Sequence, residues 1–231
     1  MAVKHYDFPN IGVVTLYKRR NARSIKITVA RGNNIRVTLP PWMPYSAGVQ
    51  FVKSKQSWIL DHQKPVEHIT DGMAVGKAHR LRFEIDELTS KPSSRITDTE
   101  VRIVVNSENQ VCHTGVQKIA RKACIRALRQ EANKLLPIRH KQIAEKYGFT
   151  YTAPQIKHLT ARWGSCSHKK DITLNLFLMQ MPWELIDYVI LHELAHTRVL
   201  NHGANFWNEM EKHLSNPKSL RKKLREHQPV F

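Results

Sequence analysis

The sequence predicts an α+β protein with a β-rich N-terminal lobe, a helical connector and a C-terminal domain built around one apolar helix. Short runs of alternating polar and apolar residues dominate the N-terminal part, which is typical of strands. Farther along, apolar residues recur at spacings of three and four, which is typical of amphipathic helices. We therefore expect two domains, residues 1–108 and residues 109–231.

The N-terminal lobe begins with a predicted β-hairpin. Alternation over residues 24–29 and 34–39 surrounds a turn at 31–33 that contains glycine and asparagine. Residues 46–62 then carry apolar side chains at mostly helical spacing, which predicts a short helix. Further strands are expected at 73–77, 81–85 and 101–105.

The connector is expected to be one long amphipathic helix from about Gly115 to Tyr147, with Pro137 kinking or breaking it. This segment carries nine basic residues against Glu131 and Glu145. A solvated helix face explains such a stripe, and phosphate contact is the alternative explanation.

Two strands, at 155–160 and 172–178, are expected to flank residues 161–167 as a hairpin or sheet edge. Pro182 then marks the start of a helix, because its fixed φ suits the first helical turn, and the apolar pattern extends to Leu200.

Composition limits the compartment and the partners. No apolar run reaches the roughly 20 residues that a membrane helix needs, and residues 1–10 lack a signal peptide's apolar stretch, so a cytoplasmic protein without a membrane partner is expected. Three widely spaced cysteines favour reduced thiols. The 37 basic and 19 acidic residues give a net charge of +18, which makes nucleic acid and nucleotides candidate partners.

The apolar helix contains the pattern HExxH, formed by His192, Glu193 and His196. Residues four apart differ by only about 40° in direction on a helix, so both imidazoles can reach one ion. The intervening glutamate projects toward the place where a metal-bound water would lie, which is the position of a general base.

A catalytic zinc usually has three protein ligands, and His202 is the candidate for the third. On a continued helix it would be rotated by about 240° from His196, out of reach of a shared ion. Asn201 and Gly203 favour the left-handed backbone that ends helices, so we expect the chain to turn there. Val199 stands where the metzincin pattern has glycine, which predicts a longer helix.

Glu209 and Glu211 compete with His202 as third ligand, by analogy with sites that use two histidines and a glutamate. A solvated helix face is the other interpretation of these two residues and the one that we favour.

Four segments together resemble the YgjP-like metallopeptidases, relatives of the WLM and SprT-like zincins: residues 162–167, 172–175, 187–196 and 201–207. Weaker similarity extends to residues 24–39, 58–60 and 75–77. The resemblance implies a minimal zincin-like domain of gluzincin type. It also implies Zn²⁺ held by His192, His196 and His202, with Glu193 as the base.

The functional hypothesis is a zinc-dependent hydrolase, most simply a peptidase acting on a peptide or protein. Glu193 would take the proton of a zinc-activated water, and an extended peptide would pair with an edge strand near 172–176. Three residues are candidates for substrate contact. Arg162 can clamp a carboxylate or phosphate, Tyr188 can line the cleft or stabilise an oxyanion, and Asn175 belongs to a matching segment.

Two alternatives remain at this stage. The net charge of +18 suits a metal-dependent hydrolase of nucleotides or other phosphate esters, although one zinc with few carboxylates is unusual for that chemistry. A nucleic-acid-binding protein with a structural metal is supported by the charge alone.

Overall fold

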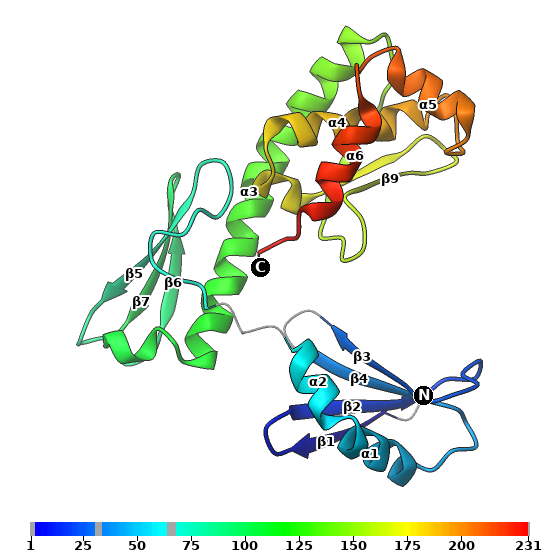
Figure 1. Ribbon diagram of the computed structural model, residues 1–231. Coiled ribbons are helices and arrows are strands. Elements are labelled where there is room, and N and C mark those ends of the chain that lie inside the picture. The colour runs from blue at the N-terminus through cyan, green and yellow to red at the C-terminus, as the bar shows by residue number, and fades with distance from the viewer. Residues whose placement is uncertain (1–2, 31–33, 64–67, 231) are drawn as a thin grey trace. The chain divides into compact units, whose positions relative to one another are not determined.

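A computed structural model describes residues 3–30, 34–63 and 68–230 of the chain (Figure 1). Helices and strands are both present, which confirms the mixed α+β class. The chain divides into two compact units, Met1–Glu67 and His68–Phe231. The expected boundary at 108/109 lies later than this division, because the strands between residues 80 and 105 pack on the long helix that follows them.

The first unit is a four-stranded sheet in the order β1-β2-β4-β3, covered by two helices. The predicted hairpin is β3 paired antiparallel with β4, and its turn at 31–33 lies outside the described residues. The first strand was not predicted, and the helix expected at 46–62 is divided in two at Lys55. The elements are β1 (Val3–Phe8), β2 (Gly12–Lys18), β3 (Lys26–Ala30), β4 (Asn34–Leu39), α1 (Tyr45–Ser54) and α2 (Gln56–His62).

The second unit begins with a three-stranded sheet in the order β5-β7-β6. Residues 73–77 do not form the expected strand and contribute only the bridge between Ala74 and Arg80. Conversely, β6 lies in a polar stretch where no strand was expected, because its pairing with β7 compensates for weak local propensity. The strands are β5 (Arg80–Ile85), β6 (Ser93–Ile96) and β7 (Glu100–Val105).

Helix α3 (Thr114–Lys146) connects this sheet to the rest of the unit. In Figure 1 the β5–β7 sheet lies beside one end of α3, and α4, α5 and α6 lie to one side of its other half, where α4 contacts it. Pro137 lies within α3 and does not break it, so of the expected kink or break, the break does not occur. The buried side chains of Leu136 and His140 hold the helix on both sides of the proline, so packing compensates for the missing hydrogen bond.

The C-terminal part combines a second three-stranded sheet, in the order β8-β10-β9, with three helices. The strand expected to reach residue 178 ends at Asn175 and continues as the 3₁₀ helix η3 (Leu176–Gln180). Within the described residues, no helix is long and apolar enough to cross a membrane. The elements are β8 (Gln155–Lys157), β9 (Gly164–Cys166), β10 (Ile172–Asn175), α4 (Trp183–Ala195), α5 (Ala204–Glu211) and α6 (Pro217–Glu226).

A buried carboxylate fixes the loop before β5 to α3. Glu131, 4% exposed, accepts hydrogen bonds from the backbone N–H groups of Lys77, Ala78 and His79 at 2.6, 3.0 and 3.0 Å. Nδ1 of His79 lies 2.6 Å from the same carboxylate. Burial acts to raise the pKa of Glu131, but these hydrogen bonds together hold it below its usual value. A Cβ on Gly76 would lie 2.2 Å from this carboxylate, so only glycine fits there.

We expect Glu131→Gln to lower the free energy of unfolding by about 3–5 kcal/mol, because the amide places an N–H₂ donor against backbone donors and leaves His79 without a charged partner. Urea denaturation measures this loss. The exposed Glu87→Gln is the matched control, since Glu87 has no such contacts. Equal stability of the two variants would show that Glu131 does not hold the loop.

Candidate metal centre

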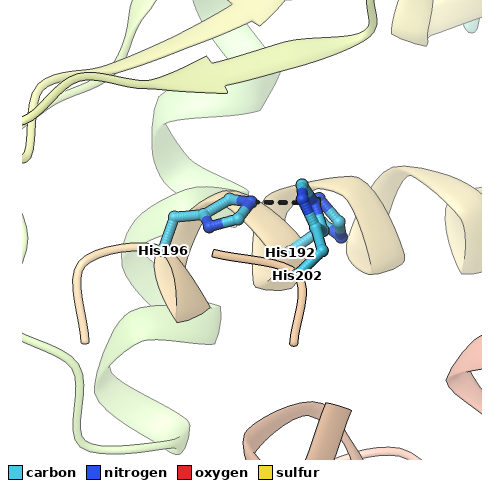
Figure 2. Close-up of side chains that lie close together, drawn as sticks. All are labelled: His192, His196 and His202. Atoms are coloured by element: carbon cyan, nitrogen blue, oxygen red, sulfur yellow. Dashed lines mark hydrogen bonds between the residues drawn. The ribbon is translucent and has the colours of Figure 1, made fainter. Parts of the chain in front are cut away.

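Three histidines from α4 and the following turn bring their ring nitrogens together (Figure 2). Nε2 of His202 lies 2.9 Å from Nε2 of His192 and 3.1 Å from Nε2 of His196. Zn–N bonds of about 2.0–2.1 Å in a tetrahedral site separate two ligand nitrogens by about 3.3 Å. The two distances from His202 are therefore within a few tenths of an ångström of what one tetrahedral ion requires, and one ligand atom from each of the three histidines lies within 4.8 Å of the other two.

The three rings carry the lone pairs that a metal ion needs. Nδ1 of His196 lies 3.0 Å from the carbonyl oxygen of Val199, and because a carbonyl only accepts, this nitrogen carries the proton and Nε2 carries the lone pair. Burial lowers the pKa of all three histidines, that of His192 to about 3. They are neutral at pH 7, which is the form in which imidazole binds metals.

His202 reaches the other histidines because the chain leaves the helix after His196. Helix α4 ends at Ala195, earlier than the predicted Leu200. Turn-type backbone hydrogen bonds, to acceptors three or four residues earlier, continue to Val199. The expected left-handed residues are absent at this turn among the described residues: Gly203 has φ −75° and Asn201 has no positive φ. Extended backbone at Gly203, before α5, redirects the chain instead.

Phe206 on α5 is fully buried beneath the three histidines. Its ring centroid lies 4.8, 4.6 and 4.8 Å from those of His192, His196 and His202. This contact limits the orientations of all three rings, so the buried Phe206 also orders the site. Farther along α4, Arg139 of α3 binds Asp187 through two hydrogen bonds of 2.7 and 2.5 Å, which fixes the position of the helix.

Glu193 is buried beside the histidines, with 6% of its surface exposed. Burial raises its pKa to about 8, and the positive charge of Arg162 opposes this rise. Gly164 of β9 lies directly against the carboxylate, because a Cβ added there would be 2.6 Å from Oε1 of Glu193. The role of Gly164 was not identified from the sequence, where a single glycine in a polar loop indicates only a turn.

A cavity of about 270 Å³ opens beside the histidines and Glu193. Arg162 and Tyr188, two of the expected substrate contacts, line it. The sequence did not predict that α6 would form another wall, with Arg221 and Arg225. Basic residues at helical spacing near the C-terminus were the available signal, but nothing local connects them to residues 192–202.

Asn175 does not face the cavity, which corrects its expected substrate contact. Its side chain is 2% exposed, and its Nδ2 donates to the carbonyl oxygens of Leu159 and Arg162 at 2.8 and 2.9 Å. Its Oδ1 accepts from the backbone N–H of Phe177 at 3.2 Å. The side chain therefore positions the loop that carries Arg162.

The edge strand also differs from expectation. Strand β10, which was expected to offer its edge to a peptide, is paired on one side with β8 and on the other with β9. The open edge beside the histidines belongs to β9, which contains Gly164.

Glu209 and Glu211, the two alternative candidates for the third metal ligand, lie outside the histidine cluster. The carboxylate of Glu209 binds Lys212 and Arg198 at 2.7 and 2.5 Å, and these contacts lower its pKa to about 2. Glu211 is exposed and lies 3.7 Å from Lys218. Neither belongs to the histidine cluster.

A family model described as "YgjP-like, metallopeptidase domain" matches residues 23–227, which is most of the chain and includes every residue of the site. The chain belongs to the YgjP-like family. This confirms the resemblance inferred from the segments around residues 162–207, and it assigns a metallopeptidase domain to the chain.

Other similarities cover smaller parts of the chain. An uncharacterized protein of Methanocaldococcus jannaschii is 37% identical over 65 residues, which are 26% of this chain and 59% of that protein's length. The crystal structure of the metallopeptidase zymogen jannalysin of M. jannaschii is 26% identical, with a TM-score of 0.36, over 39% of this chain and 94% of that one. Abylysin of Pyrococcus abyssi, also a metallopeptidase zymogen, is 23% identical, with a TM-score of 0.35, over 39% and 91%.

Replacing Asn175 by alanine should reduce the free energy of unfolding by about 2–3 kcal/mol, since the carbonyls of Leu159 and Arg162 lose their donors. Chemical denaturation provides the measurement, with the exposed Asn208→Ala of α5 as control. If Asn175 instead contacted substrate, its replacement would leave stability at the level of the control.

Proposed function

We propose that the chain is a zinc-dependent peptidase in which His192, His196 and His202 hold the metal and Glu193 is the general base. The observation that carries this proposal is the convergence of three neutral imidazole Nε2 atoms beside a buried carboxylate. Together with α5 and the β9 edge, α4 would form a minimal zincin-like site of gluzincin type.

The donor set suits zinc better than the hard cations. Three nitrogen ligands with one position left open are typical of catalytic zinc, whereas magnesium and calcium prefer oxygen. The buried Nδ1 of His192 has no hydrogen-bond partner in the described part of the chain. The polar contact of this ring is made by Nε2, which faces the other histidines. A bound zinc ion would supply Lewis acidity and an acidified water.

In its ionised form, which a bound cation would favour over the protonated form, Glu193 is positioned to accept a proton from the nucleophilic water and to return it to the leaving amine. Its burial excludes bulk water, and contact with Gly164 on one side leaves the carboxylate few alternative positions. Because Gly164 also belongs to the open edge of β9, the carboxylate lies where a peptide added to that edge would pass.

Tyr188 is a further polar residue of the cavity wall. Its hydroxyl is buried and has no hydrogen-bond partner among the described residues, and burial raises its pKa to about 12. The hydroxyl therefore remains protonated and can donate a hydrogen bond to the substrate carbonyl oxygen as negative charge develops on it.

The variant Glu193→Gln should retain its metal and lose hydrolysis of peptides by about 10²–10⁴-fold, which is the usual contribution of a general base. Metal analysis and a peptide-cleavage assay on one preparation test both parts. Glu184→Gln makes the same change at the exposed start of α4 and should behave as wild type. Full activity of Glu193→Gln would disprove the mechanism.

Removal of the third ligand should weaken the affinity for zinc. We expect His202→Ala to lower it more than about a hundredfold, because even partners outside the ligand shell contribute about 10–100-fold. Competition with a chelating dye measures the affinity directly. His168→Ala removes an exposed histidine outside the cluster and serves as control. Unchanged zinc affinity in His202→Ala would remove this residue from the ligand set.

A further inference from the structure

The cavity beside the histidines has an unusual charge distribution. Its lining contains three arginines, Arg162, Arg221 and Arg225, and one carboxylate, that of Glu193. None of these arginines forms an ion pair with a carboxylate in the described part of the chain. Guanidinium groups beside a cavity that have no carboxylate partner are available for an anionic ligand.

The three arginines come from two separate walls. Arg162 lies in the loop before β9, which Asn175 holds in place. Arg221 and Arg225 are four residues apart on α6 and therefore lie one above the other on one helix face. An anion in the cavity would have positive charge on both sides.

Helix α6 is anchored firmly enough to present these groups. Leu220 and Leu224 pack against the core, and Asn216 caps the helix by accepting from the backbone N–H of Ser219 at 3.0 Å. Arg221 also lies over the ring of Trp207, with its guanidinium carbon 5.3 Å from the ring centroid. This stacking restricts the side chain before any ligand binds, which reduces the entropy lost on binding.

The electrostatic influence of these residues reaches the other side of the cavity. Burial raises the pKa of Tyr188, and the charges of Arg221 and Arg225 act against that rise. Two arginines of a C-terminal helix thus act on a hydroxyl one turn before His192 on α4.

We propose that Arg162, Arg221 and Arg225 make the enzyme selective for peptides that carry a carboxylate next to the scissile bond. This rests on the proposed peptidase function, because a peptide bond must lie beside Glu193 for its neighbouring residue to enter the cavity. A carboxylate can accept two parallel N–H bonds from a guanidinium group. The carboxylate can belong to an acidic side chain or to the C-terminus of the peptide.

The test compares hydrolysis of matched peptides by the zinc-loaded full-length protein. Each peptide carries Asp or Glu, or the neutral Asn or Gln, at one position, and each is made with a free and with an amidated C-terminus. We expect wild type to cleave carboxylate-bearing peptides with about tenfold higher kcat/KM, which is the usual scale of one charge-assisted hydrogen bond. Comparing Asp or Glu with Asn or Gln in amidated peptides measures the effect of a side-chain carboxylate. Comparing the free with the amidated C-terminus in Asn or Gln peptides measures the effect of the terminal carboxylate.

The preference, measured as the ratio of kcat/KM for an acidic peptide to kcat/KM for its neutral partner, should fall toward one in Arg225→Gln and in Arg162→Gln. Because it is a ratio, a change in overall activity does not affect it. Lys222→Gln removes the same charge from the adjacent, exposed position of α6, outside the cavity lining, and should keep the preference. Equal preference in Arg225→Gln and Lys222→Gln would overturn the proposal, as would the absence of any preference in wild type.

A binding measurement separates this proposal from the peptidase function. Fluorescence anisotropy with labelled peptides and zinc-loaded Glu193→Gln reports affinity without turnover. Selective binding of acidic peptides without any cleavage by wild type would support the arginine site and disprove the peptidase. If pyrophosphate binds in an Arg225-dependent way and acidic peptides do not, the cavity takes phosphate and the carboxylate proposal is wrong.

Discussion

Burial of α4 is the constraint on which the rest of this structure depends. The helix contacts α3, β9, β10, α5 and α6, so nearly all of its surface is covered by protein. His192 and Glu193 lie on this covered helix and His196 is its C-cap. Charged or unpaired polar groups buried there cost several kcal/mol each. The structure meets this cost by keeping the three histidines of the cluster neutral and by directing their Nε2 atoms to one point.

The contacts around α4 explain why that point is well defined. The ion pair between Arg139 and Asp187 fixes the helix on α3, and Phe206 packs beneath all three imidazole rings. Gly164 brings the β9 backbone against Glu193, at a distance that no larger residue would allow. A site assembled from residues far apart in sequence is thus held by one helix, one aromatic ring and one glycine. Such prearranged groups are what catalysis by positioned charges requires.

The position of the basic residues is more informative than the net charge of +18. Many basic residues lie on exposed faces, where solvent screens them and their energetic effect is small. Arg162, Arg221 and Arg225 differ because they surround the cavity beside Glu193. A low-dielectric wall strengthens their interaction with an anion, so these few residues determine which ligand is favoured.

The sequence by itself determined the elements whose pattern is local: the β3–β4 hairpin, the long helix α3, and the helix that places His192 and His196 one turn apart. The pattern also allowed His202 as a third ligand, although the turn that brings it back uses extended backbone at Gly203 and no left-handed residue.

Tertiary structure decided what depends on contacts between distant segments. Strand β6 exists because β7 pairs with it, α3 continues through Pro137 because both flanks are packed, and β10 is central because β8 and β9 pair with its two edges. The side chain of Asn175 holds the loop that contains Leu159 and Arg162, and α6 forms a wall of the cavity. Local sequence carries no signal for such relationships, because their free energy comes from surfaces that meet only once the chain has folded.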